Sequence, residues 1–507
     1  MISQFAGAAF SDFPEEMNFS YDAKWREFVD KMKAASTKVF ELPIDLKAEL
    51  RPYQTEGYQW LQRMADWGAG ACLADDMGLG KTVQAIAMLL SRAKDGPALV
   101  VAPASVCANW ISELAKFAPS LNAYNLSQAT DRNKCIEDLK AAEVLVTTYG
   151  LLHQASDTLC AKKFNTIVLD EAQSIKNRFT KRSQAAMELQ GDFKIITTGT
   201  PIENHLGELW NLFHFINPGL LGTAKMFQER FSLPIEKWGD KEKRGQLQKL
   251  IKPFILRRLK KEVLKDLPEK TEITLRIERS DAESSFYEAL RRKALDSIQG
   301  GKFEHEGAKR LQVLAELMRL RRCCCHPALI SGGEKIPSSK LEALKDLVDE
   351  LLQNGHKALI FSQFVDYLRI IEKEIKKMGV SYQYLDGSTP LKKRKTAIDA
   401  FQSGDGDIFL ISLKAGGTGL NLTAADYVIH VDPWWNPAVE DQASDRAHRI
   451  GQQNPVTVYR LVAEGSIEEK IVKLHGSKRE MAEALLQDTD GKVTLNADDL
   501  LDLLKGF

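Results

Sequence analysis

The stretch from Ala74 to Thr82 constrains the fold of this chain more than any other part of the sequence. A short apolar run, Gly70–Leu73, precedes it, and apolar residues at helical spacing follow it. The pattern predicts a buried strand, a turn that contains Gly78 and Gly80, and the start of a helix. Glycines in such a turn let backbone N–H groups surround a phosphate, and the helix N-terminus adds a partial positive charge.

The chemistry predicted for this turn is that of a phosphate loop. Lys81 would reach the β- and γ-phosphates of a nucleotide, and the Thr82 hydroxyl would hold Mg²⁺. The usual pattern has glycine six residues before the lysine, and Asp75 stands there instead. A simple turn with a solvated lysine is therefore an alternative that other motifs have to exclude. The predicted nucleotide-binding residues of the turn are Asp76, Met77, Gly78, Leu79, Gly80, Lys81 and Thr82.

The size and composition of the chain limit its class. With 507 residues, of which 44% are hydrophobic and 27% charged, it is long enough for roughly two to four globular domains. No apolar run reaches the roughly 18 residues that a membrane span needs, and the N-terminus lacks the features of a signal peptide. We therefore expect a cytoplasmic protein with no membrane partner. The formal net charge is +0, so any surface that binds nucleic acid must be local.

The seven cysteines include three adjacent ones, Cys323–Cys325, which His326 follows. Adjacent cysteines suit neither a disulfide framework nor the paired spacing of a zinc site. We expect these cysteines to be reduced and to serve the packing of a helix.

Short apolar runs alternate with helical stretches in two separate series. This alternation predicts an α/β fold with two parallel-sheet lobes that are covered on both faces. The segment between the series, about 205–335, is charge-rich and predicted to be helical, with no comparable strand run. The expected strands are Ala98–Ala102, Val144–Thr147, Thr166–Leu169 and Lys194–Thr197 in the first lobe, and Ala358–Phe361, Tyr382–Leu385, Ile408–Ser412, Tyr427–Val431 and Val456–Leu461 in the second.

Two carboxylates, Asp170 and Glu171, follow the apolar run Thr166–Leu169. Ligands bind at the carboxyl ends of the strands in an open parallel sheet, so both side chains would face the phosphate loop. Asp170 would hold Mg²⁺, directly or through water, and Glu171 would polarise the attacking water. The alternative is an acidic helix start, which the Gly-Lys-Thr turn upstream disfavours.

Three further motifs follow expected strands. Thr198–Asn204 could sense the γ-phosphate, although a simple turn is the better reading of that stretch alone. The glycine-rich stretch Lys414–Asn421 permits close approach to a phosphate. Arg446 and Arg449 are three residues apart and would share a face of a helix, as a pair of arginine fingers or as part of a solvated basic helix.

Taken together, the chain resembles the Swi/Snf-type DNA translocases, the remodelling ATPases of helicase superfamily two, over residues 46–475. Asp75 fits this family, which usually has an acidic residue at that place. Ala172 and Gln173 depart from the Gly-His of many relatives. The blocks that carry the resemblance are Leu50–Gln54, Asp170–Gln173, Thr200–Asn204, Pro253–Arg258, Cys325–Pro327, Asp386–Ser388 and Trp435–Pro437.

The resemblance implies two RecA-like lobes with helical protrusions between them, and ATP in the cleft between the lobes. The tail resembles the end of bacterial members, which often carry a long N-terminal region, so the chain is expected to be the motor part of a longer protein. The implied domains are a helical lead segment (1–45), lobe 1 (46–204), a first protrusion with a linker (205–275), a second protrusion (276–338), lobe 2 (339–475) and a helical tail (476–507).

The resemblance also implies further site residues. Gln54 would read the adenine base, and Trp435 would wedge against the duplex unless it is a core tryptophan. The nucleotide-binding set further includes Gln173, Gly417 and Gln442. The residues expected on the DNA backbone are Ser105, Asn109, Thr148, Gln363, Ser388, Ser412 and Lys414.

The expected function is that of a monomeric, nucleoid-associated translocase that hydrolyses ATP with Mg²⁺. It would move along double-stranded DNA without separating the strands, and remodel or displace bound proteins. The alternatives are an ATPase that recycles RNA polymerase, a non-catalytic DNA-binding scaffold and a strand-separating helicase. The residues that argue against a scaffold are the expected catalytic set, Lys81, Asp170, Glu171, Arg446 and Arg449.

Overall fold

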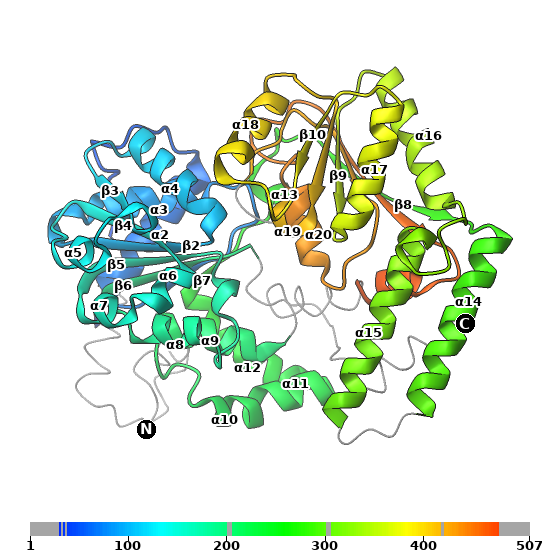
Figure 1. Ribbon diagram of the computed structural model, residues 1–507. Coiled ribbons are helices and arrows are strands. Elements are labelled where there is room, and N and C mark those ends of the chain that lie inside the picture. The colour runs from blue at the N-terminus through cyan, green and yellow to red at the C-terminus, as the bar shows by residue number, and fades with distance from the viewer. Residues whose placement is uncertain are drawn as a thin grey trace. The chain divides into compact units, whose positions relative to one another are not determined.

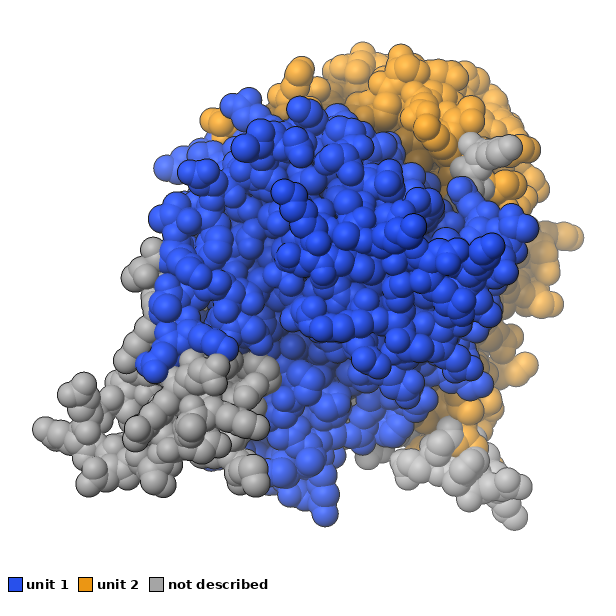
Figure 2. Space-filling view, turned by 90° about the vertical axis from the view of Figure 1, so that its left-hand side faces the viewer, with its two compact units in different colours: residues 1–265, 481–492 blue, residues 266–480, 493–507 orange. Residues whose placement is uncertain are grey.

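The computed structural model describes residues 30–31, 34–35, 38–199, 205–300, 306–416 and 420–475. These residues form two compact units, and the chain passes from unit 1 to unit 2 between Lys265 and Asp266 (Figure 2). Within the described ranges, no helix is both long enough and apolar enough to cross a bilayer.

Unit 1 is built on a seven-stranded sheet in which every pair of neighbours is parallel, in the order β3-β4-β2-β5-β6-β1-β7. Strand β2 is buried along its whole length, as expected for a sheet that is covered on both faces. The strands are β1 (Ala71–Leu73), β2 (Ala98–Ala102), β3 (Asn122–Asn125), β4 (Glu143–Thr148), β5 (Lys163–Asp170), β6 (Gln190–Thr197) and β7 (Ile255–Leu256).

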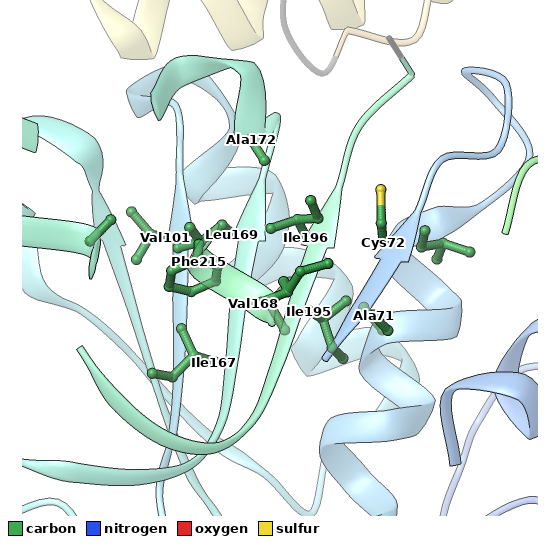
Figure 3. Close-up of a cluster of buried hydrophobic side chains, with 14 of the residues drawn as sticks. Ala71, Cys72, Val101, Ile167, Val168, Leu169, Ala172, Ile195, Ile196 and Phe215 are labelled. Carbon is green, nitrogen blue, oxygen red and sulfur yellow. The ribbon is translucent and has the colours of Figure 1, made fainter. Parts of the chain in front are cut away.

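Helices cover both faces of this sheet (Figure 1). Figure 3 shows the apolar side chains of the central strands, among them Val168 and Ile196, with Phe215 from α9 lying against the sheet. The α-helices of unit 1 are α2 (Pro52–Trp67), α3 (Lys81–Ser91), α4 (Ala104–Phe117), α5 (Arg132–Glu137), α6 (Tyr149–Gln154), α7 (Ser156–Ala161), α8 (Lys181–Glu188), α9 (Leu206–Ile216), α10 (Ala224–Phe227), α11 (Leu233–Trp238), α12 (Lys241–Ile251) and α13 (Lys260–Val263).

Unit 2 has a six-stranded sheet, also parallel throughout, in the order β10-β11-β9-β12-β13-β8. Its strands are β8 (Lys270–Ile277), β9 (Ala358–Ser362), β10 (Tyr382–Leu385), β11 (Ile408–Ser412), β12 (Tyr427–His430) and β13 (Val456–Ala463). Its labelled helices are α14 (Asp281–Gln299), α15 (Glu306–Cys325), α16 (Ser339–Gln353), α17 (Val365–Lys377), α18 (Leu391–Gln402), α19 (Leu413–Gly416) and α20 (Pro437–Ser444). The expected α/β fold with two parallel-sheet lobes is therefore confirmed.

The three adjacent cysteines end α15 and are buried, as expected for helix packing. Cys323 and Cys324 belong to an apolar cluster with Tyr287 of α14 and Leu320 of α15. Burial raises the pKa of the Cys323 thiol to about 12, so the thiol is neutral. No group of three His, Cys, Asp or Glu side chains in the described ranges is arranged to hold a metal ion.

Two strands lie in the segment that was expected to contain none, about 205–335. Strand β7 has two residues and extends the first sheet, and β8 has eight and pairs with β13 along its full length. Most residues of β8 are exposed or half-buried, because the strand lies at the edge of its sheet. Its sequence therefore lacks the apolar run by which the other strands were recognised. The proposed boundaries of the two helical protrusions stay a prediction, and the tail 476–507 lies outside the described residues.

Candidate ATP and DNA site residues

Four neighbouring strands of unit 1 end at the same level. In their registers Asp170 lies opposite Thr197, Thr197 opposite Leu73, and Leu73 opposite Leu256. The chain leaves these ends into the acidic motif, the turn after β6, the phosphate loop and the stretch before α13. The structure thus brings the separate first-lobe motifs to one edge of the sheet, where parallel α/β sheets bind their ligands.

The loop from β1 to α3 has the conformation that its glycines allow. Gly78 and Gly80 have φ angles of 84° and 79°, in the left-handed region that favours glycine. Helix α3 begins at Lys81, directly after Gly80. The Lys81 ammonium donates hydrogen bonds to the backbone carbonyls of Asp75 at 2.6 Å and Asp76 at 3.3 Å. The lysine is therefore partly buried against its own loop, and its contact with a phosphate stays a prediction.

Asp75, the departure from the usual loop pattern, is fully buried and ion-paired. Its carboxylate accepts hydrogen bonds from Arg258 Nε at 2.9 Å and from Arg258 Nη2 at 2.5 Å. Gln84 of α3 approaches the same carboxylate at 3.4 Å. The position that is glycine in the usual pattern thus holds a charge that fixes the loop to a segment about 180 residues further along the chain.

Gln54, the residue expected to read adenine, lies on α2 against the phosphate loop. Its Nε2 donates to the carbonyl of Leu79 at 3.0 Å, and the Tyr53 hydroxyl donates to the same carbonyl at 3.0 Å. Only 6% of Gln54 is exposed. The structure brings this side chain to the loop, and its contact with a base stays a prediction.

Asp170, at the end of β5, accepts three hydrogen bonds on its carboxylate. Trp110 Nε1 donates to Oδ2 at 2.8 Å, the Thr197 hydroxyl donates to Oδ1 at 2.6 Å, and the Glu171 backbone N–H donates to Oδ1 at 3.0 Å. A carboxylate offers about four lone-pair sites, so room for one more ligand remains. Trp110 and Thr197 were not predicted from the sequence as site residues. They lie 60 and 27 residues from Asp170 along the chain, and no local pattern marks contacts over such distances in sequence.

Glu171 is one of two non-glycine residues of the described chain with a positive φ, at 49°. This conformation is costly for a residue with a side chain and is often found at functional sites. Gln173 Nε2 donates to the Glu171 carboxylate at 2.8 Å, and the Thr198 hydroxyl donates to Gln173 Oε1 at 3.0 Å. Gln173 therefore joins the acidic motif to the end of β6.

Two neutral groups surround the acidic motif. The Tyr149 hydroxyl donates to the Asp170 carbonyl at 2.8 Å, and burial together with the nearby carboxylates raises its pKa well above the usual value. Burial, with a smaller effect of Asp170, raises the pKa of the Cys107 thiol to about 12. Both groups therefore stay uncharged beside the carboxylates near neutral pH.

The first-lobe residues expected on DNA lie at the end of β4 and on the helix that follows β2. Ala102, at the end of β2, lies opposite Thr148, at the end of β4. Ser105 and Asn109 are on α4, which follows β2. The Thr148 hydroxyl accepts the Leu151 N–H at 3.1 Å and caps α6. These positions share the carboxyl edge of the sheet with the phosphate loop.

The second-lobe residues expected on DNA also lie at one sheet edge. Gln363 follows β9, Ser412 ends β11 opposite Ser362, and Lys414 is exposed on α19. Ser388 follows β10 and donates its hydroxyl to Asp386 at 2.6 Å. The sheet order makes β10, β11 and β9 neighbours, so all four positions are grouped.

Trp435 is half-buried and packs against the apolar cluster of α14 and α15. The Arg321 guanidinium of α15 lies 5.3 Å from the centroid of its ring. These contacts favour the reading as a core tryptophan over that as a wedge against the duplex.

Arg446 and Arg449 come together, but not for the expected reason. Helix α20 ends at Ser444, so both arginines lie in the turns that follow it, and the helical spacing that was expected to unite them is wrong. Their Nη1 atoms approach the same backbone carbonyl, that of Leu420, at 3.5 Å and 3.1 Å.

Of the other nucleotide-binding residues expected in the second lobe, Gln442 is buried in α20. Gly417 and the stretch Thr200–Asn204 lie outside the described residues.

Comparisons with known proteins identify the family of the chain. The SNF2-related domain matches residues 53–329, and the helicase conserved C-terminal domain matches residues 339–451. YwqA of Bacillus subtilis, whose name describes an ATP-dependent helicase/translocase, is 41% identical over 96% of this chain and 54% of its own length. The ATP-dependent helicase MG018 of Mycoplasma genitalium is 37% identical over 94% of this chain and 46% of its own length. The chain thus spans about half the length of these relatives.

Among solved structures, the SWI2/SNF2 ATPase core of Sulfolobus solfataricus in complex with dsDNA is 37% identical, covers 92% of this chain and 97% of its own, and has a TM-score of 0.46. The family domain alone accounts for more than half of the chain, and it begins at Tyr53, beside Gln54 and upstream of the phosphate loop. The chain belongs to the SNF2-related family of ATP-dependent enzymes.

Proposed function

We propose that this chain is a duplex-DNA-stimulated ATPase that moves along DNA and displaces or repositions the proteins bound there. The observation that supports this most is the common level at which β5, β6, β1 and β7 end. A lysine loop after β1 and a hydrogen-bonded carboxylate at the end of β5, with only β6 between the two strands, are what phosphoryl transfer to water requires. The family membership supports the use of ATP.

The roles proposed for the first-lobe residues follow from their chemistry. Lys81 binds the β- and γ-phosphates, and Gln54 reads the base. Thr82 and Asp170 would hold Mg²⁺, since both offer the hard oxygen ligands that this ion prefers and the Asp170 carboxylate has an acceptor site to spare. When bound, the ion would neutralise charge on the phosphate oxygens. Glu171 orients and polarises the attacking water, with Gln173 holding its carboxylate.

Arg446 and Arg449 are proposed to stabilise the charge that develops on the transferred phosphoryl group. Two guanidinium groups that share one carbonyl as acceptor can contact neighbouring phosphate oxygens. Glycines in the stretch around Gly417 would let a phosphate approach the backbone there. These roles rest on the residue types and on the family resemblance.

For DNA, we propose contacts with the phosphate backbone rather than with bases. The side chains at the two sheet edges are hydroxyls, amides and one lysine, which suit phosphate contacts that carry no sequence information. Binding should then weaken with salt, with log K falling by about 0.9 for each phosphate neutralised per unit of log salt. We propose that the enzyme acts as a monomer on the DNA of the cytoplasm.

The test is the ATPase rate of Lys81→Ala and Glu171→Gln in the presence of duplex DNA. Both variants should lose hydrolysis, whereas Lys163→Ala, which removes an exposed ion pair with Asp192, should keep it. Turnover retained in both site variants would overturn the assignment. Stimulation by RNA polymerase beyond that by DNA would favour the polymerase alternative, and opening of a forked duplex would favour a strand-separating helicase.

A further inference from the structure

The segment that leads from unit 1 towards unit 2 is attached to the phosphate loop before it leaves. We call Ile255–Lys260 the connecting segment. Its first two residues form β7 beside β1, and beyond the strand the contact continues along the loop. The Ala74 N–H donates to the Leu256 carbonyl at 2.7 Å, and the Asp76 N–H donates to the Arg258 carbonyl at 3.0 Å. The Lys260 N–H in turn donates to the Asp76 carboxylate at 3.0 Å.

The side chain of Arg258 makes the strongest of these contacts. Its Nε and Nη2 atoms bond both oxygens of Asp75, which is a bidentate, charge-assisted pair. Asp75 is fully buried, and the Arg258 side chain is 12% exposed. Removing one partner of such a pair leaves the other charge buried without compensation, which is far more costly than the net value of the pair.

Arg258 also reaches the two helices that flank the loop. Its Nη2 donates to Gln84 Oε1 of α3 at 3.0 Å, and its Nη1 donates to the carbonyl of Tyr53 on α2. Its guanidinium lies 5.3 Å from the centroid of the Tyr53 ring. One side chain therefore joins α2, the loop and α3, the helix that follows the loop.

Gly57 leaves the room for this arrangement. A Cβ at position 57 would lie 1.9 Å from Gln84 Oε1 and 2.7 Å from Arg258 Nη2, so a larger residue has to displace both side chains. This glycine lies within α2, where alanine would otherwise be the better helix former. The glycine therefore serves the packing around Arg258.

We propose that Arg258 is a positioning residue: it holds Asp75 and thereby places Lys81 for the binding of ATP. This proposal rests on the proposed function of the loop. The Lys81 ammonium is bonded to the carbonyls of Asp75 and Asp76, the two residues that Arg258 holds through its side chain and its backbone carbonyl. Loss of the guanidinium releases Asp75, so the Asp75 carbonyl that accepts the Lys81 ammonium is no longer held in place, whereas Asp76 keeps its backbone contact with residue 258. Arg258 thus belongs to the last part of unit 1 before the boundary at Lys265, and that part is attached to the loop.

The experiment compares Arg258→Met, Arg258→Lys and Gly57→Ala with the unchanged chain, at saturating duplex DNA. Arg258→Met should raise the KM for ATP at least about tenfold and lower kcat by less than about threefold, since Arg258 positions the binding loop and does not touch the reacting atoms. Arg258→Lys should restore part of the loss, and Gly57→Ala should raise the KM in the same way. Gly245→Ala is the matched control, because nothing lies within 4 Å of a Cβ at position 245.

A second readout separates this proposal from the proposed function. The affinity for a fluorescent ATP analogue, measured without DNA, should fall by the same factor in Arg258→Met and in Gly57→Ala. Unchanged affinity and KM in a folded Arg258→Met protein would overturn the role of Arg258. If that variant does not fold, unchanged values in Gly57→Ala overturn it. If Arg258→Met weakens binding of the analogue but the unchanged chain shows no DNA-stimulated turnover, the proposed function alone is refuted.

Discussion

The indole N–H of Trp110 donates a hydrogen bond of 2.8 Å to the carboxylate of Asp170. Trp110 is fully buried on α4, the same helix that carries Ser105 and Asn109. The helix with two of the residues proposed to contact DNA thus holds the carboxylate proposed to bind Mg²⁺. A small shift of α4 on DNA binding would therefore move the Asp170 carboxylate.

The first prediction concerns this contact. Trp110→Phe keeps an aromatic ring in the core and removes the only donor of the indole. A hydrogen bond to a charged group contributes about 1.5–3 kcal/mol, so kcat with duplex DNA should fall about tenfold or more, and further than the rate without DNA. ATPase rates with and without DNA measure this, and Trp238→Phe, at a residue that is 70% exposed, is the control. Equal rates for Trp110→Phe and the unchanged chain would refute the link.

The second prediction concerns the arginine pair. Arg446→Ala and Arg449→Ala should each lower kcat by about 10³-fold, in the range of other arginine fingers, while the affinity for an ATP analogue changes only a few-fold. Lysine should not restore the rate at either position, because an ammonium cannot reproduce the planar, bidentate contact. Single-turnover hydrolysis and equilibrium binding distinguish the two effects. A variant that loses binding and keeps its rate would exclude the role proposed here.

The third prediction concerns the stability of unit 2. Lys340 and Glu468 form an ion pair of 2.6 Å in which the side chains are 2% and 1% exposed. Lys340→Met leaves the carboxylate buried and unpaired, which should lower the free energy of unfolding by about 3–5 kcal/mol. The double change Lys340→Met with Glu468→Leu should cost less than the single one. Urea unfolding tests this against Lys377→Met, whose side chain is 71% exposed and whose loss should cost less than about 1 kcal/mol.

The fourth prediction is a pH dependence of folding. Burial lowers the pKa of His430 from 6.5 to about 4, and the neutral ring contacts the Ser444 hydroxyl at 2.8 Å. Between pH 6.5 and 4 the unfolded chain binds a proton at this histidine and the folded chain does not. The free energy of unfolding should therefore fall by about 3 kcal/mol from this group as the pH drops through that window.

His430→Gln should make the unfolding free energy less sensitive to pH between 6.5 and 4, because the group no longer titrates. Replacement of the exposed His153 by glutamine should leave the pH dependence as it is. Urea unfolding at pH 7, 5.5 and 4.5 measures the slope for each chain. The same slope in His430→Gln as in the unchanged chain would show that this histidine is not held neutral.

The sequence predicted the strands that are buried on both faces, because such strands are continuous apolar runs. Ala98–Ala102 and Ile408–Ser412 have the expected bounds in the structure. Strand β8 was not predicted, because it is an edge strand with charged, exposed residues. The apolar pattern of a sequence reports burial, and few residues of an edge strand such as β8 are buried.

The site was predictable where its chemistry is local. The loop at Lys81 and the pair Asp170 and Glu171 follow strands directly, so a strand pattern was enough to find them. Trp110 and Arg258 were not predicted as site residues, since they reach their carboxylate partners across 60 and 183 residues of chain. Such contacts depend on the order of strands in the sheet, which a local pattern does not reveal.

The central claim is that the loop at Lys81 hydrolyses ATP in response to duplex DNA. Its most direct test is the steady-state ATPase rate of the unchanged chain and of Lys81→Ala with duplex DNA, single strands, RNA and no nucleic acid, each at two salt concentrations. The account predicts that duplex DNA gives the largest rate in the unchanged chain, that salt reduces this stimulation, and that Lys81→Ala shows none under any condition. A rate that duplex DNA does not raise, or one that survives in Lys81→Ala, would contradict it.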